Sequence, residues 1–125
     1  MLPIGLNHMT VPHASVRELI GIAARLGCVG IELRNDLSKP LFDGLGTSEL
    51  KSLLAENDLR LLAIAEVPAF NDALPDKTDA VLDLIKQGMA CGAEGIALIT
   101  KVASAPVDRA EQRTAMRDAL IMMQP

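Results

Sequence analysis

The sequence predicts an α/β fold built from four βα units, and an internal repeat is the main reason. Residues 27–34 and 92–99 share one pattern, a glycine and two variable residues followed by Gly-Ile-x-Leu. A glycine that ends a helix before a short apolar strand is typical of a chain re-entering a parallel sheet. The copies lie 65 residues apart, from Gly27 to Gly92, which is about two βα units of roughly 30 residues each. This period predicts half of a (β/α)8 barrel, with parallel strands in the order 1-2-3-4.

The first βα unit is predicted from helical spacing. An apolar run over residues 2–8 forms the first strand, and a helix begins at Ala14 or Ser15. The helix runs to about Leu26, with apolar residues recurring at the helical period: Val16, Leu19, Ile20, Ala23 and Leu26. Gly27 ends this helix, and residues 28–34 form the second strand.

The remaining elements follow the same alternation. In chain order they are a long loop over 35–46, a helix from Thr47 or Ser48 to Asn57, a strand over 60–67, a helix over 76–91, a strand over 94–100 and a helix from the cap Asp108 to about Met123. The order βαβαβαβα predicts a parallel sheet with right-handed crossovers. We expect residues 1–125 to form one half-barrel domain.

Alternation within the strands separates a large aliphatic face from a small or polar one. The aliphatic face is predicted to hold Ile4, Leu6, Ile31, Leu33, Leu62, Ile64, Ile96 and Leu98. The other face is predicted to hold Gly5, Asn7, Gly30, Glu32, Arg34, Ala63, Ala65, Ala97 and Ile99. An open doubly wound sheet is apolar on both faces, whereas a barrel interior turns polar toward its carboxyl-terminal mouth. This pattern therefore favours the barrel.

Composition excludes some functions. The formal net charge is −4 and there are only two aromatic residues, Phe42 and Phe70, so the stacking rings and basic groove of a nucleic-acid platform are missing. No apolar run has the length of a membrane span, and the chain passes from Met1 into a strand without a leader-like segment. Cys28 and Cys91 have no paired spacing and predict reduced, buried thiols. These features lead us to expect a cytoplasmic protein.

Three segments resemble a known family. Residues 5–10 (GLNHMT), residues 30–36 (GIELRND) and Phe70-Asn71 resemble the N-terminal half of the xylose isomerase-like barrels. This is the sugar phosphate isomerase/epimerase group, which includes 2-keto-myo-inositol isomerase. The resemblance covers essentially the whole chain, and its most specific element is Glu-Leu-Arg-Asn-Asp with the following Pro40 and Gly44.

The resemblance implies both a reaction and what this chain lacks for it. Such enzymes hold a divalent metal (Mn, Co, Zn or Mg) with two Glu, one Asp and one His from strands five to eight. Paired carboxylates there move a proton between adjacent carbons of a ketose or inosose. Since only four strands are predicted here, no metal ligand is carried over, and we expect no cofactor on this chain alone and assign no catalytic residue.

The resemblance implies a substrate-binding wall made of Asn7, Glu32, Arg34 and Asn71. Each residue has a simpler alternative. Glu32 can pair with a neighbouring arginine, Arg34 can pair with Glu32 or Asp36, and Asn71 can form a turn. The family often places a polar residue near the end of strand three, where Ala63 and Ala65 stand here. Alternation predicts that Glu66 points away from the inner face.

Neither histidine is predicted to bind a ligand. Alternation places His8 on the opposite face of the strand from Asn7, so we expect it to have a structural role, and we expect His13, which follows Pro12, to lie at the surface. A metal set of His8, His13 and Glu32 is the alternative, with ligands that suit zinc or manganese.

We therefore expect the N-terminal half of a sugar or inosose isomerase or epimerase barrel, contributing part of a pocket for a small polyol or keto-sugar but not catalytic alone. The rivals are a complete small α/β binding or signalling domain, with strand order 2-1-3-4, and a non-catalytic self-assembling half-barrel. The runs 4–6 and 96–99 lack the charges and prolines that discourage edge pairing. They predict a homodimer or larger assembly in which strand four pairs with strand one of another copy.

Overall fold

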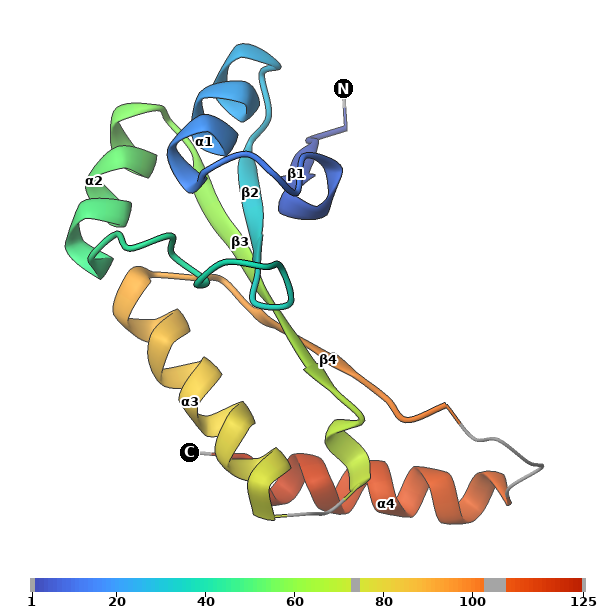
Figure 1. Cartoon of the computed structure of the whole chain (residues 1–125). Coiled ribbons are helices and arrows are strands. Elements are labelled where there is room, and N and C mark those ends of the chain that lie inside the picture. Colours follow the sequence, from blue (N-terminus) through green and yellow to red (C-terminus); the bar gives the residue numbers. More distant parts are fainter. Residues whose placement is uncertain (1, 73–74, 103–107, 125) are drawn as a thin grey trace.

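Four parallel strands form one sheet in the order β1-β2-β3-β4 (Figure 1). The structure is a computed structural model that describes residues 2–72, 75–102 and 108–124. The elements are β1 (Gly5–Asn7), the 3-10 turn η1 (His8–Thr10), α1 (Val16–Arg25), β2 (Gly30–Arg34), α2 (Thr47–Glu56), β3 (Arg60–Pro68), the 3-10 turn η2 (Phe70–Asp72), α3 (Pro75–Cys91), β4 (Ile96–Ile99) and α4 (Arg109–Met122). The sequential order confirms the half-barrel prediction and contradicts the order 2-1-3-4 of the signalling-domain rival.

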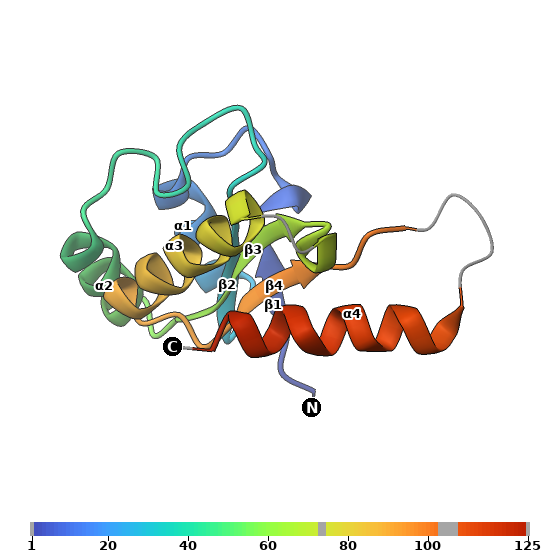
Figure 2. The ribbon, with the colours of Figure 1, turned by 90° about the horizontal axis from the view of Figure 1, so that it is seen from below.

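The helices α1, α2 and α3 lie along one face of the sheet (Figure 1). The core is the layer of side chains between these helices and the sheet. Most of its buried side chains are aliphatic, and the fully buried ones include Leu19, Ile31, Leu33, Leu50 and Ile64. The last helix departs from this arrangement. It packs mainly against η2, burying Ala119 and Met123, and its first half extends beyond the sheet (Figure 2). None of the described helices is long and apolar enough to span a bilayer.

The helix boundaries follow the signals in the sequence. Ser15 caps α1 in a reciprocal capping box, in which the Ser15 backbone N–H donates to Glu18 Oε2 at 2.7 Å. Gly27 and Gly92, the first residues of the two repeats, have φ of +69° and +76°. Left-handed backbone of this kind favours glycine. Both repeats therefore use glycine to end a helix before the next strand begins.

Strand β3 does not alternate evenly, and this corrects one prediction. The register pairs Ile31 with Leu61 but Glu32 with Ala63, so one residue of β3 is passed over. As a result Leu61 is buried on the helix-facing side, where alternation had put Leu62. Leu62 instead lies over Gly5 and Gly30 on the inner side, since a Cβ built on Gly5 would come within 2.5 Å of Leu62 Cδ1.

Substituting Gly30 tests this packing. A Cβ on Gly30 would lie 2.4 Å from the Arg60 carbonyl oxygen and 2.8 Å from Leu62 Cγ. Because the first of these is backbone, the neighbour cannot rotate away, and we expect Gly30→Ala to destabilise the protein by about 1–3 kcal/mol. The matched control is Gly21→Ala within α1, where only the flexible Arg25 guanidinium is near. We expect it to stabilise by about 0.5–1 kcal/mol. Urea unfolding measures both, and equal effects would contradict the packing described.

Candidate functional site

Arg34, the last residue of β2, is the centre of a charged cluster on the inner side of the sheet. Its Nε donates to Asp36 Oδ1 at 2.8 Å, and its Nη2 donates to the other oxygen of Asp36. The same Nη2 lies 3.3 Å from Glu66 Oε2, and the Arg34 side chain is only 16% exposed. We call Arg34, Asp36 and Glu66 the Arg34 cluster. Two carboxylates therefore hold one mostly buried guanidinium in a fixed orientation.

Glu66 reaches this cluster because β3 changes register a second time, between Ala65 and Val67. Asn35 holds the shifted backbone: its Nδ2 donates to the Glu66 carbonyl at 3.0 Å, and its Oδ1 accepts from the Glu66 N–H at 2.6 Å. The prediction that Glu66 points away from the inner face is therefore wrong, because it assumed unbroken alternation. The only sign of this shift in the sequence was Asn35, directly after β2, because an asparagine side chain can donate to and accept from the backbone of a neighbouring strand.

The electrostatics of the cluster reflect these contacts. The hydrogen bond from Arg34 lowers the pKa of the Asp36 carboxyl below its ordinary value. The hydrogen bond to Asp36 in turn raises the pKa of Arg34, with smaller contributions from the charges of Glu66 and Glu32. Glu32, which is half-buried, thus lies close enough to act on the guanidinium. Three carboxylates surround one cation, which leaves an excess of negative charge.

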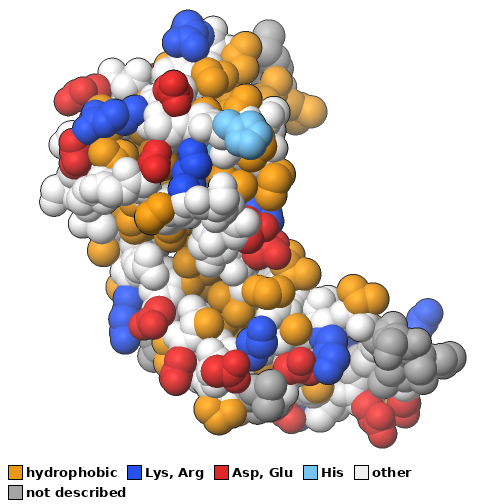
Figure 3. All heavy atoms as spheres, viewed as in Figure 1, with side chains coloured by type: hydrophobic (Ala, Val, Ile, Leu, Met, Phe, Trp, Pro, Cys, Tyr) orange, Lys and Arg blue, Asp and Glu red, His pale blue; other side chains and the backbone are white. Residues whose placement is uncertain are grey.

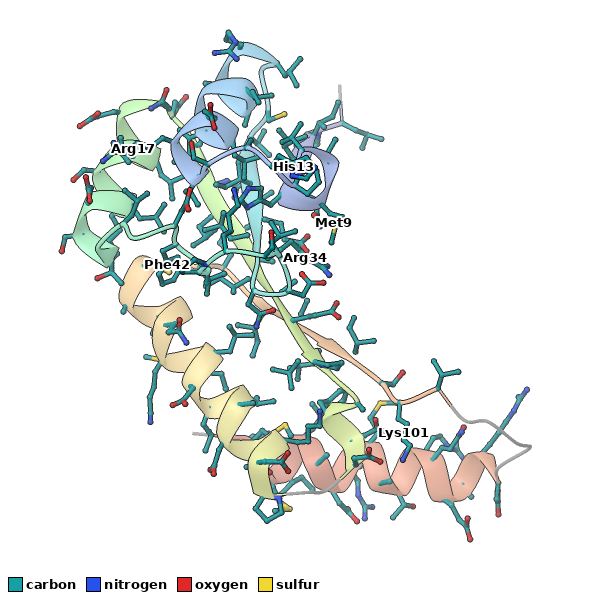
Figure 4. The ribbon with its side chains drawn as sticks, viewed as in Figure 1. Met9, His13, Arg17, Arg34, Phe42 and Lys101 are labelled. Carbon is teal, nitrogen blue, oxygen red and sulfur yellow. The ribbon has the colours of Figure 1, made fainter. Side chains whose placement is uncertain are left out.

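The other two predicted wall residues make structural contacts. Asn7 Oδ1 accepts from the Met9 N–H at 2.7 Å and caps η1. Because η1 begins at His8, β1 covers only Gly5–Asn7 and is shorter than the strand predicted over residues 2–8. Asn7 still pairs with Glu32 in the sheet register. Asn71 Oδ1 accepts from the Lys101 N–H at 2.8 Å. Lys101 lies well away from Arg34 (Figure 4). The structure thus brings Glu32 and Arg34 together, puts Asn7 beside Glu32, and uses the Asn71 oxygen elsewhere.

The histidines stand apart from the cluster. His8 is 1% exposed, and its Nε2 hydrogen-bonds to the Ala14 carbonyl at 2.8 Å, a structural role as predicted. His13 is exposed. Within residues 2–72, 75–102 and 108–124, no three His, Cys, Asp or Glu side chains gather as a metal site. The alternative set of His8, His13 and Glu32 is therefore not assembled.

Comparison with solved structures defines the class of fold. The chain superposes on a xylose isomerase domain containing protein from Salmonella typhimurium with a TM-score of 0.82, at 19% identity, over 95% of this chain and 46% of that one. It matches D-psicose 3-epimerase from Clostridium cellulolyticum with a TM-score of 0.65, at 12% identity, over 98% of this chain and 48% of that one.

A third match has a TM-score of 0.70 at 11% identity, over 94% of this chain and 20% of a fusion of a xylose isomerase-like TIM barrel with 4-hydroxyphenylpyruvate dioxygenase. The fold is thus half of a xylose isomerase-like TIM barrel, and the chain spans less than half of each of these three proteins. No protein-family model and no curated protein matches the sequence.

Titration of Asp36 tests the Arg34 cluster. Because the folded pKa of Asp36 is lowered, its contribution to stability is complete above about pH 4 and is lost as pH falls through the folded pKa. We expect carboxyl NMR to give a depressed pKa for Asp36 in the wild type, rising toward the ordinary value in Arg34→Gln.

The control for this titration is Arg60→Gln. Arg60 is the first residue of β3 and pairs with Glu94 at 3.0 Å, at the amino-terminal end of the strand. That variant should leave the Asp36 titration unchanged. A normal Asp36 pKa in the wild type would mean that the ion pair does not form in solution.

Proposed function

We propose that this chain supplies one wall of a polyol-binding pocket in a sugar isomerase/epimerase-type barrel. The observation that carries the proposal is the Arg34 cluster beside Glu32, on the inner side of β2 and β3 near their carboxyl ends. In TIM barrels the carboxyl-terminal end of the strands is where substrates bind. The resemblance of the sequence to the sugar phosphate isomerase/epimerase group leads us to propose ketoses, inososes and related polyols as the ligands.

The hydrogen-bonding capacity of the cluster suits a polyhydroxyl ligand. A guanidinium has five N–H donors, and the interactions that the described residues make with Arg34 use Nε and Nη2. Among the described residues no group accepts from the two donors on Nη1, so they can bind a ligand oxygen, while the carboxylate of Glu32 can accept from a hydroxyl. Asp36 and Glu66 orient the guanidinium before the ligand arrives, which lowers the entropic cost of binding.

This wall binds and orients but does not complete a catalytic site. The family that the sequence resembles moves the proton with paired carboxylates on strands five to eight, and the carboxylates of the Arg34 cluster lie on one wall only. The described residues also do not assemble the ligand set of a divalent metal. We therefore propose that the chain alone neither holds the metal tightly nor turns over a keto-sugar.

Ligand-observed NMR tests the proposal directly. Saturation-transfer signals should be seen with a ketose or an inosose and not with a monohydroxy alcohol of similar size. Arg34→Gln and Glu32→Gln should each lower the affinity for the ligand by roughly tenfold, since each removes a charge-assisted hydrogen bond. The saturation-transfer signal should weaken accordingly. Arg60→Gln is the matched control, because it breaks an arginine–carboxylate pair at the other end of the sheet. Binding that survives Arg34→Gln and Glu32→Gln would place the polyol elsewhere.

A further inference from the structure

Both edges of the sheet are open. In a closed barrel each strand has two neighbours, but β1 pairs only with β2 and β4 only with β3 among the described residues. The unpaired backbone of β4 is flanked by aliphatic side chains, Ile96, Leu98 and Ile99, without a charge or a proline in the strand. Such an edge is a template for another strand.

Several exposed apolar side chains lie in or next to the two edge strands. Leu2, Ile4 and Met9 flank β1, Ile99 and Val102 lie at the end of β4, Leu26 ends α1, Met89 lies on α3, and Met116, Leu120, Ile121 and Met122 lie on α4. Figure 3 shows hydrophobic atoms at the surface both near the N-terminal segment and over the lower part toward α4. These are all the exposed large hydrophobic side chains that the described residues include. Apolar surface concentrated in this way marks an interface.

The β4 side also holds a groove. A cavity of about 180 Å³ lies between α3 and β4, lined by Ile85, Gly88, Met89, Ala93, Gly95 and Ile96. In an ordinary βα unit the following helix covers this region, but here α4 packs on η2 instead. The groove is therefore open on the same flank as the unpaired edge of β4.

We propose that a second copy of this chain covers both open edges of the sheet. In this dimer β1 of each copy pairs in parallel with β4 of the other around a two-fold axis. Ile4 shares the helix-facing side with Leu6, which packs against the core. Beside β4, the partner's Ile4 therefore comes next to Ile96 and enters the groove. Ile4 is 63% exposed in the single chain, so this contact buries apolar surface that is otherwise in water.

The internal repeat favours a second copy over another partner. The repeat of two βα units makes β1 equivalent to β3, because β4 carries the pattern of β2. The partner's β1 beside β4 thus repeats the pairing of β3 with β2.

The inference rests on the proposed function, because the second copy completes the same pocket. Closure brings Glu32 and the Arg34 cluster of one chain opposite those of the other around a shared mouth. Glu32 and Arg34 of the second copy then form the opposite wall of the pocket. A ligand bound between the two copies meets carboxylates from both sides.

Sedimentation velocity without sugar tests the partner separately from the ligand. The wild type should sediment at twice 13.3 kDa at micromolar concentration. Ile4→Lys and Met89→Lys lie on opposite flanks and are exposed, so the chain should still fold, which circular dichroism checks. Each should weaken the dimer by at least about tenfold, because the lysine would be buried without a partner. The control Ser52→Lys, on an exposed position of α2, should have no effect.

Mixing the two variants distinguishes the arrangement. In the proposed dimer, a pair of one Ile4→Lys chain and one Met89→Lys chain keeps one intact interface, so the mixture should form dimers more strongly than either variant alone. A monomeric wild type, loss of the dimer with only one of the two variants, or no gain on mixing would each overturn the proposal. Sugar binding by the monomeric variants, measured by NMR, then tests the proposed function independently.

Discussion

The pairing of β2 with β3 is the constraint on which the rest of the structure depends. This pair lies in the middle of the sheet, and both strands carry core residues on their helix-facing side. Two register shifts in β3, near Leu62 and near Glu66, change which side chains face the helices. Leu61, Ile64 and Val67 are buried as a result. A parallel strand that skips a residue twice can therefore fill the core and still turn selected side chains inward.

The inner side of the sheet is a consequence of the same shifts. Leu62 covers Gly5 of β1 and Gly30 of β2, and at Gly30 the Arg60 carbonyl oxygen also leaves no room for a side chain. Further along, Glu66 joins Arg34 and Asp36, and Asn35 holds the backbone that makes this contact. The inner side of the sheet is therefore apolar near the amino-terminal ends of the strands and charged near their carboxyl-terminal ends. This matches the packed interior and polar mouth of a barrel. The candidate site depends on β3 as much as on the residues of β2.

The sequence predicted the parts of this structure that local chemistry decides. Gly27 and Gly92 were predicted to end helices and Ser15 to begin one, each from its position next to an amphipathic run, and the structure has them in those roles. The strand order also followed from the repeat of βα units. The position of Glu66 did not, because alternation is counted along a strand and a register shift is decided by the neighbouring strand. Nor did the location of α4, since capping by Asp108 predicts a helix but not the surface it packs on.

The central claim is that the shifted strand β3 brings Glu66 to Arg34 on the inner side of the sheet. A double-mutant cycle with Arg34→Gln and Glu66→Gln, measured by urea unfolding, tests it most directly. Because the two side chains are in contact and largely shielded from water, the account predicts a coupling free energy of at least about 0.5 kcal/mol. Effects that add to within about 0.3 kcal/mol would show that the two residues do not interact and would contradict the account.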